Sequence, residues 1–447
     1  MKDKKLLTIL IFFIITRLMP YFGSFVPTGY DAGLYLYLLK HAPFIPTWLA
    51  GSYYSILFFV LTPITKLGSD LSVLLIPLQI GAALFIFFAL NWAIKAMMSR
   101  DQRLFTLFIY TISAIQFRMY WFYYVKNMFA LGFLLLFLGA FYRRRYLPAA
   151  IFGILVGLIH LPTFFILGAI CAIEFIIHAN KVKTALIFAI SLCFTLIFYI
   201  PVFSVSILPY FKPFLEANRI VQPLANTDWG GTFYGLFPSI LLMIAYLCLP
   251  IYYFFKNRKV FKEFVRTPYF SGLVATSIIV IGQFFFFKRF IPVWDIFIII
   301  AAGYSVKQFL SMKYFYLILT SLFIVFFILK TGLPLKTTGD IAELQKTPIP
   351  QKSYVLSTSK EDTSWIIGYT NAEVIAWNFG SHSQLLSDTD WNRFYSTNTV
   401  DEYNVLLQKL PQPLYVYVST KEAPQFQTLL KSKLLKKVSN QLYAVHK

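Results

Sequence analysis

The feature that most constrains this sequence is a series of apolar runs of roughly 20 residues, recurring from the N-terminus to about Lys330. A helix of that length spans the hydrocarbon core of a bilayer. Of the 447 residues, 58% are hydrophobic and only 13% are charged, and the mean hydropathy is +0.66. Soluble globular domains do not have this balance. The pattern therefore predicts an all-α polytopic membrane protein.

The positions of the basic residues indicate whether the chain interacts with a lipid bilayer or with a nucleic acid. The sequence has 40 Lys and Arg residues against 19 Asp and Glu residues, which gives a formal net charge of +21. Most of the Lys and Arg residues stand in short loops between apolar runs, where they follow the positive-inside rule. A groove that tracks a phosphate backbone would cluster them differently. We therefore expect the lipid bilayer as a partner, and no nucleic acid.

The loop charges also set the direction of each span. With the basic N-terminus inside, the first run brings residue 31 to the outer side. If residues 48–67 also crossed, the triple Arg at 143–145 would fall outside, so we expect juxtamembrane helices over 31–67 on the outer face. About eleven spans are then predicted, at residues 6–19, 71–98, 104–117, 125–141, 147–159, 164–177, 184–202, 233–255, 270–287, 290–309 and 314–329.

A change of composition near residue 336 predicts two domains. Residues 1–335 form the transmembrane domain, and residues 336–447 form a small α/β domain on the outer side. Four short runs, at 354–358, 374–377, 414–418 and 442–445, are rich in β-branched and aromatic residues and predict strands. Helices are predicted at 402–410 and at 425–435, where apolar residues recur at helical spacing.

The same features predict where the protein lies. The N-terminus is expected in the cytoplasm and the C-terminal domain outside it, in the plasma membrane of a prokaryote. The sequence has no Asn-x-Ser/Thr acceptor, in keeping with that source. Its three cysteines, Cys171, Cys193 and Cys248, lie in apolar runs without the spacing of metal ligands.

Asp31 is the first carboxylate beyond Asp3 and follows the helix-breaking Pro27 and Gly29. We expect it at the start of a short helix at the outer edge of the membrane. A carboxylate there can take a proton from a substrate hydroxyl, or orient a phosphate bound to a metal. The alternative is that Asp31 merely caps the helix.

Cations near the outer face need an explanation, because they break the inside-positive bias. Arg289 can hold a phosphate with two parallel hydrogen bonds, which suits it to an anionic lipid head group. Its neighbour Lys288 either assists or snorkels to the interface. Arg118 and Lys126, with Asn127, form a second basic group among aromatic residues that are either a sugar platform or the ordinary interfacial belt.

Three further polar residues are candidates for the site, each with a structural alternative. His160 lies where two expected spans meet at Pro162, and it can have a functional role or be a satisfied structural group. Asp228 and Trp229 lie in a long outer loop, where an Asn/Asp/Gly-rich turn explains the pattern equally well. The Asp388-Thr-Asp390 pattern resembles a metal and nucleotide-sugar motif, but it is short enough to arise by chance.

This layout resembles the GT-C superfamily of integral-membrane glycosyltransferases. The resemblance covers residues 1 to about 330, and it is one of architecture rather than of a long motif. In one respect the sequence departs from the pattern. Many members have two adjacent acidic residues at this position, whereas here Asp31 is followed by Ala32. The catalytic role would therefore depend on Asp31 alone. The resemblance is carried by Asp31, the juxtamembrane run 54–68, Arg118, Lys126, Asn127, His160 with Pro162, and residues 288–292.

The resemblance implies a mannosyltransferase-like enzyme that transfers a hexose or pentose from a polyprenyl-phosphate-linked donor at the outer face. Asp31 would deprotonate the acceptor hydroxyl, and Arg289, helped by Lys288 or Arg118, would stabilise the leaving lipid phosphate. The acceptor, whether glycan, lipid or protein, is unknown. Mg²⁺ or Mn²⁺ is a possible cofactor, with unknown ligands.

Two alternatives come from other classes of protein. A transporter or flippase of a lipid-linked anion would use Asp31, His160 and Asp295 to relay protons, but no inverted repeat is visible. A scaffold whose outer domain binds partners would explain that domain, but not the outer cations.

Overall fold

The computed structural model describes residues 4–22, 26–27, 29–66, 70–177, 181–208, 236–284, 287–305, 320–321, 324, 338–346, 349–370, 372–377, 382–420 and 422–446. The chain forms two compact units. The helical unit comprises Met1–Phe22, Leu49–Val60 and Ile76–Leu333, and the sheet unit comprises Gly23–Trp48, Leu61–Leu75 and Pro334–Lys447. The sheet unit thus contains Gly23–Trp48 and Leu61–Leu75, which the sequence analysis assigned to the transmembrane domain.

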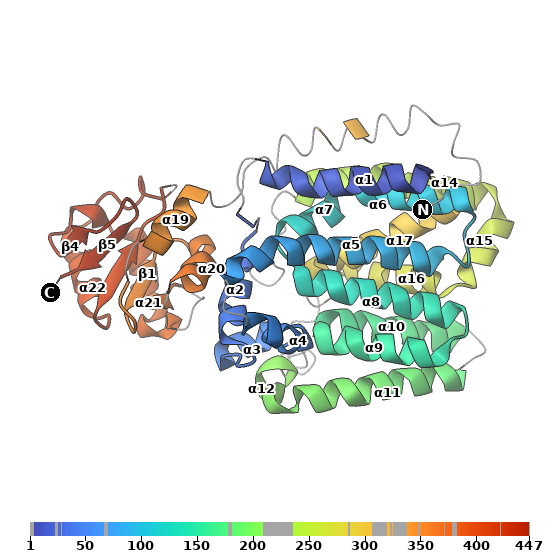
Figure 1. The fold of residues 1–447 in the computed structure, drawn as a ribbon, viewed down its shortest axis with the longest axis horizontal. Helices are drawn as coiled ribbons and strands as arrows, with labels where there is room; N and C mark the ends of the chain where they lie inside the picture. The colour runs from blue at the N-terminus through green and yellow to red at the C-terminus, as the bar shows by residue number, and fades with distance from the viewer. Residues whose placement is uncertain are drawn as a thin grey trace. The chain divides into compact units, whose positions relative to one another are not determined.

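The helical unit is a bundle whose main helices run alongside one another (Figure 1). Its neighbouring pairs include α8 with α9, α9 with α11, and α16 with α17. Helices α3 and α4 lie across the division between the units. The elements of this part of the chain are α1 (Lys4–Leu18), η1 (Met19–Tyr21), α3 (Thr47–Tyr53), α4 (Ile56–Thr65), α5 (Leu75–Ile94), α6 (Arg100–Ile112), α7 (Ala114–Trp121), α8 (Val125–Tyr142), α9 (Tyr146–Ile159), α10 (Leu161–Ile177), α11 (Lys181–Tyr199), η3 (Ile200–Val202), α12 (Phe203–Ser206), α14 (Leu236–Lys256), α15 (Arg258–Val265), α16 (Pro268–Ile281) and α17 (Phe287–Ser305).

Within the described residues, 3 helical stretches are long and apolar enough to cross a membrane, or up to 5 if each bent helix pair is one span. The three are Leu71–Ile94, Val125–Tyr142 and Lys181–Ser206. Helices α9 and α10 are apolar but shorter. The count of about eleven spans therefore stays a prediction, and its last span, 314–329, falls mostly outside the described residues.

Several predicted spans are broken by local sequence signals. The predicted span 104–117 is two helices, α6 and α7, that meet at Ser113. The Ser113 side chain accepts a hydrogen bond from the backbone N–H of Gln116, which starts α7 as a new helix. The run 48–67, which was predicted as juxtamembrane helices and not as a span, forms the two helices α3 and α4, bent by 114°. The predicted span 270–287 ends at Ile281, and the loop expected after residue 255 contains α15.

Small residues let α9 and α11 pack closely. A Cβ atom on Gly157 would lie 1.9 Å from Thr195 Oγ1, and one on Gly153 would lie 2.5 Å from Ser191 Oγ. On both helices the two small residues are four positions apart, which is the small-xxx-small pattern of membrane helix pairs. Figure 1 shows the two helices side by side. Close backbone approach, rather than large side chains, therefore holds this pair together.

We expect Gly157→Ala to lower the free energy of unfolding by about 1 to 3 kcal/mol, because the added methyl group overpacks the α9–α11 contact. Thermal unfolding of the purified protein in detergent measures the effect. Gly81→Ala in α5 is the matched control, because its Cβ atom would meet nothing within 4 Å. Alanine also favours a helix by about 1 kcal/mol over glycine, so the control should be neutral or stabilised. Equal unfolding temperatures for the two variants would contradict the packing argument.

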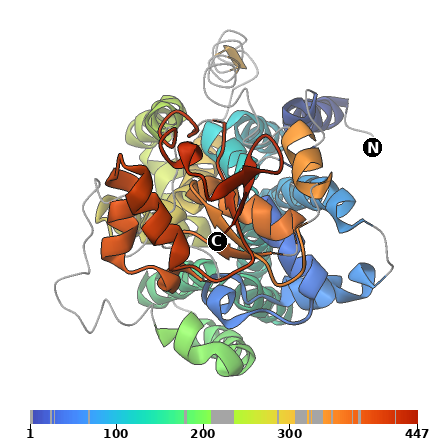
Figure 2. The ribbon, with the colours of Figure 1, turned by 90° about the vertical axis from the view of Figure 1, so that its left-hand side faces the viewer.

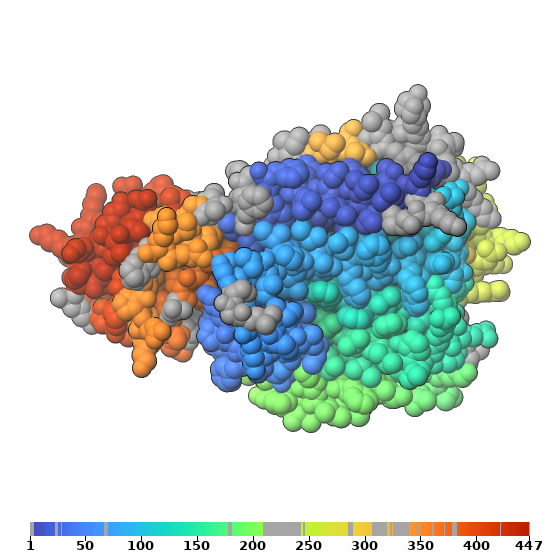
Figure 3. Space-filling model, viewed as in Figure 1, coloured from blue at the N-terminus to red at the C-terminus, as the bar shows by residue number. Residues whose placement is uncertain are grey.

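Apolar side chains on α11 are exposed, as expected of a surface that contacts lipid. Val182 is 80% exposed, and Leu186, Phe194 and Ile197 are exposed as well. Figure 3 shows this helix in green along one edge of the helical unit. In water such a row would favour association, whereas in a bilayer it is the ordinary boundary of the protein.

The sheet unit contains a five-stranded sheet in the order β2-β1-β3-β5-β4. Strands β2, β1 and β3 are parallel, whereas β5 is antiparallel to both of its neighbours. The strands are β1 (Tyr354–Ser357), β2 (Glu373–Ile375), β3 (Leu414–Tyr417), β4 (Leu435–Lys437) and β5 (Leu442–Val445). The helices are α2 (Asp31–His41), η2 (Leu71–Leu74), α19 (Thr338–Lys346), α20 (Lys360–Tyr369), η5 (Ser383–Leu385), α21 (Asp388–Ser396), α22 (Val400–Gln408) and η6 (Leu429–Lys431).

The connections of the parallel strands explain where the helices lie. Helix α20 joins β1 to β2, and α21 and α22 join β2 to β3 on the other side of β1. Right-handed crossovers in opposite directions place their helices on opposite faces of a sheet. Figure 2 shows this, with α20 in orange on one side of the strands and the deeper orange α21 and α22 on the other.

The sequence predicted the α/β character of this region and four of the strands. The helix predicted at 425–435 is wrong, because this stretch forms turns, the short η6 and then β4. The Ser432 hydroxyl donates to Asn404 Oδ1 at 2.5 Å and accepts from the backbone N–H of Leu434, which ends the helical turn. Leu435 then pairs with Val445 of β5. Pairing with a distant strand therefore outweighed the local helical pattern.

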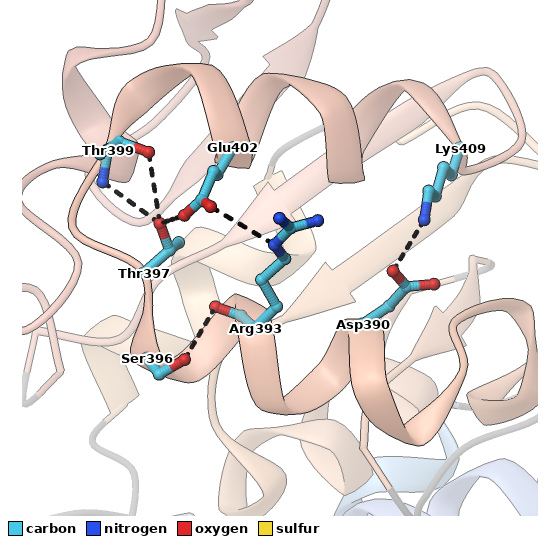
Figure 4. Close-up of polar contacts among 7 residues, drawn as sticks. All are labelled: Asp390, Arg393, Ser396, Thr397, Thr399, Glu402 and Lys409. Carbon is cyan, nitrogen blue, oxygen red and sulfur yellow. Dashed lines mark hydrogen bonds and ion pairs between the residues drawn. The ribbon is translucent and has the colours of Figure 1, made fainter.

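The Asp388-Thr-Asp390 pattern is the first turn of α21. The Ser387 side chain caps this turn by accepting from the backbone N–H of Asp390. Asp390 in turn pairs with Lys409 Nζ at 2.7 Å, and this hydrogen bond lowers the pKa of Asp390. Figure 4 shows this pair beside the contact of Arg393 with Glu402, both joining α21 to the chain around α22. The acidic pattern is thus accounted for by capping and ion pairing.

Candidate active site

Asp31 is the first residue of α2 and is partly buried. The capping position belongs to Tyr30, whose side chain makes no capping hydrogen bond. The alternative that Asp31 merely caps the helix is therefore wrong, because its carboxylate belongs to the first turn. A negative charge in the first turn interacts favourably with the positive end of the helix dipole. The rest of α2 is largely apolar and buried, so the helix holds this carboxylate in a fixed position.

In the helical unit, two of the predicted basic residues are buried. Arg118 on α7 is 5% exposed, and its guanidinium carbon lies 5.5 Å from the centre of the Phe122 ring. Lys126, in the first turn of α8, donates to the backbone carbonyl of Ser52 and lies 4.5 Å from the centre of the Tyr53 ring. Lys126 therefore fastens α3 to α8. Its neighbour Asn127 is partly buried on the same helix.

His160 occupies the connection between α9 and α10, outside both helices. Its Nδ1 atom is 2.8 Å from Thr163 Oγ1. Burial lowers the pKa of His160 well below its ordinary value, and the positive charges of Lys126 and Arg289 lower it further. The imidazole is therefore neutral at physiological pH. The same electrostatic contacts show that the structure brings His160, Lys126 and Arg289 together.

Two hydrogen bonds, which the sequence analysis missed, hold the break between α3 and α4 close to His160. The Ser55 hydroxyl donates to the carbonyl of Ile159, the residue before His160, at 2.9 Å. The Tyr199 hydroxyl donates to the carbonyl of Tyr54 at 3.1 Å. These partners are more than one hundred positions apart in each case, 104 and 145. No local sequence pattern could therefore have revealed them.

Other predicted residues lie outside the described part of the chain. Asp228 and Trp229 fall in the gap between residues 208 and 236. Lys288 belongs to α17, but its side chain is not described. Arg289, next to it, is partly buried in the first turn of the same helix.

Asp295, which the transporter hypothesis uses, is completely buried on α17. Its carboxylate accepts hydrogen bonds from Ser113 Oγ at 2.7 Å, from Gln116 Nε2 at 2.9 Å and from the hydroxyl of Tyr246. Three donors from the α6–α7 break and from α14 therefore satisfy the group. A buried polar group needs such partners for stability alone, so its burial is explained without a transported proton.

The described residues include no group of three or more His, Cys, Asp or Glu side chains that could hold a metal ion. The donors that Mg²⁺ and Mn²⁺ prefer are oxygens, chiefly of carboxylates. None of the described residues is therefore assigned as a metal ligand.

Neither a protein-family model nor a curated protein matches the sequence. Solved structures do match. AglB, an archaeal oligosaccharyltransferase from Archaeoglobus fulgidus in complex with an inhibitory peptide and a dolichol-phosphate, gives a TM-score of 0.61 at 12% identity, over 97% of this chain and 71% of that one.

ArnT from Cupriavidus metallidurans matches over 98% of this chain and 97% of its own, at 11% identity. The TM-score is 0.60 for its apo state and 0.59 for the structure bound to undecaprenyl phosphate. Both neighbours are membrane glycosyltransferases of one superfamily. The chain therefore shares its fold with these two proteins, and this is the fold that the resemblance in its sequence implied.

Proposed function

We propose that this chain is a membrane glycosyltransferase that moves a sugar from a polyprenyl-phosphate-linked donor to an acceptor hydroxyl at the extracytoplasmic face. The observation that carries the proposal is a fold shared over nearly the whole length with ArnT, one structure of which holds undecaprenyl phosphate. AglB, with dolichol-phosphate bound, has the same fold. The sugar is a hexose or pentose, as in mannosyltransferases.

In the proposed reaction, Asp31 takes the proton of the acceptor hydroxyl as its oxygen attacks the anomeric carbon. The bond from that carbon to the phosphate oxygen breaks, and polyprenyl phosphate leaves with the electron pair. The configuration at the anomeric carbon is inverted. General-base help of this kind requires a carboxylate that can reach the hydroxyl and lies on a fixed support.

Negative charge grows on the lipid phosphate as the bond breaks, and fixed cations contribute most where charge develops. We assign Arg289 as the phosphate clamp. Two observations support it: its position in the first turn of α17, where backbone N–H groups also favour an anion, and the positive charges of Arg289 and Lys126, which both act on His160 and so mark a basic region there. Lys288 or Arg118 assists, and Lys126, Asn127, His160, Asp228 and Trp229 support the bound substrates.

Incubating the purified protein with radiolabelled polyprenyl-phosphate sugars and bacterial membrane extract tests the proposal. We expect transfer of label to an acceptor, or slow hydrolysis of the donor without one. Adding EDTA tests the metal in the same assay, since a Mg²⁺- or Mn²⁺-dependent enzyme stops and recovers when the ion is returned. Movement of an unmodified donor lipid across vesicles, without transfer, would favour the flippase instead.

A further inference from the structure

Within the sheet unit, helices α2 and α20 cross with their backbones in contact. A Cβ atom on Gly33 would lie 2.1 Å from the carbonyl oxygen of Ser364, and one on Gly368 would lie 2.3 Å from the carbonyl oxygen of Gly33. Real Cβ atoms do not approach backbone atoms this closely. Both helices therefore need glycine at this point, and either substitution would force them apart.

Two hydrogen bonds fasten the ends of the same contact. The Ser364 hydroxyl donates to the carbonyl of Tyr30 at 2.5 Å, and Lys40 Nζ donates to the carbonyl of Gly368 at 2.6 Å. Tyr30 stands directly before Asp31, whereas Lys40 lies near the other end of α2. At about 1.5 Å per residue, Tyr30 and Lys40 are roughly 15 Å apart along the chain of α2, whereas their partners Ser364 and Gly368 are roughly 6 Å apart on α20. The long side chain of Lys40 spans the difference. Helix α2 is thus held at its start, its middle and its end.

Helix α20 is itself firmly placed. It contacts both β1 and β2, and its residues Trp365 and Ile366 are completely buried. On the facing helix, Leu34 and Leu38 are also completely buried. A helix packed against a sheet on one side is a rigid support for what it carries on the other. The position of the first turn of α2 is therefore determined by α20.

We propose that α20 is the positioning element of the general base: the C-terminal part of the chain serves catalysis by setting where the Asp31 carboxylate lies. This inference rests on the proposed function, in which Asp31 takes the acceptor proton. Ser364 and Gly368 are its positioning residues, and they do not touch the substrates. The inference gives the C-terminal part of the chain a role in the chemical step, rather than in holding the lipid-linked donor.

Gly368→Ala tests the inference. Its methyl group moves the backbone of α2 by an amount of the order of 1 Å, and a misplacement of this size costs about 10-fold to 100-fold in rate. We expect kcat to fall by that factor, with the donor KM within twofold of wild type. The acid limb of the kcat–pH profile should also shift, because the carboxylate has changed surroundings. Each rate is divided by the amount of protein that binds donor, so that a loss of folded protein is not mistaken for a lower kcat.

Two further variants make the result decisive. Gly81→Ala, with open space around its Cβ atom, should match wild type. Ser364→Ala removes the bond to Tyr30 without adding volume, and it becomes the deciding variant if Gly368→Ala fails to fold; a loss of about threefold or more in kcat, at an unchanged donor KM, supports the inference.

A fall in active protein with an unchanged pH profile would show a merely structural contact and overturn the inference. So would unchanged kcat in both Gly368→Ala and Ser364→Ala, while Asp31→Asn is inactive. In either case the proposed function stands. An inactive wild type contradicts the proposed function itself.

Discussion

The Asp31→Asn protein is expected to fold, to bind the polyprenyl-phosphate sugar donor, and to transfer its sugar about 100-fold to 10,000-fold more slowly than wild type. Asparagine has nearly the shape of aspartate, and Tyr30, not Asp31, holds the capping position, so the helix should be preserved. The amide has no useful basicity. It therefore cannot take the proton of the acceptor hydroxyl, and only the chemical step is lost.

Single-turnover transfer and equilibrium binding of a radiolabelled donor separate these two effects. Asp388→Asn is the matched control, because Asp388 is the first residue of α21, in the same unit, just as Asp31 is the first residue of α2. The control should transfer sugar at the wild-type rate. If Asp31→Asn kept transfer within a factor of a few, Asp31 would not be the base, and Asp228 would be the next carboxylate to replace.

Removing the Arg289 guanidinium should give the second-largest effect. We expect Arg289→Ala to lower kcat/KM by about 100-fold to 1,000-fold, the usual loss when one fixed donor to a developing anion is removed. Arg289→Lys keeps the charge but loses the two parallel hydrogen bonds, so it should recover only part of the activity. A donor titration with single-turnover rates measures both variants.

Arg393→Lys is the control for this substitution, because Arg393 is exposed and pairs with Glu402 on the surface of the sheet unit. It should leave transfer unchanged, since exposed pairs contribute little. Lys288→Ala should cost less than Arg289→Lys if Lys288 only snorkels to the interface. Wild-type activity in Arg289→Lys would move the clamp to Arg118.

The sequence predicted those helices whose own residues determine them. The spans expected at 125–141, 147–159 and 164–177 are close to α8, α9 and α10, because each is a continuous apolar run between loops. The break at Ser113 was missed, although a serine followed three residues later by a glutamine was a visible start signal. Helix α20 was missed as well, since residues 360–364 are all polar and residues 365–369 are apolar or glycine, so apolar side chains do not recur at helical spacing.

In the candidate site, too, features set by neighbouring residues could be predicted, whereas contacts between residues far apart in the sequence could not. Asp31 and the start of its helix could be predicted from Pro27 and Gly29 alone. The contacts of Lys126 with Ser52 and of Ser55 with Ile159 could not, because each joins residues that are far apart in sequence. The glycine crossing of α2 and α20 is of the same kind. Nothing around Gly33 indicates that another backbone lies against it.

The bond between Ser364 and Tyr30 joins residues that are 334 positions apart in the chain. At about 5 to 20 residues per second, a ribosome makes these two residues roughly 17 to 67 s apart. During that interval the nascent protein already has α2, but not the helix α20 that holds it in place. The proposed base therefore acquires its support only near the end of translation. A chain that terminates early would then be catalytically silent, even with all of its membrane helices inserted.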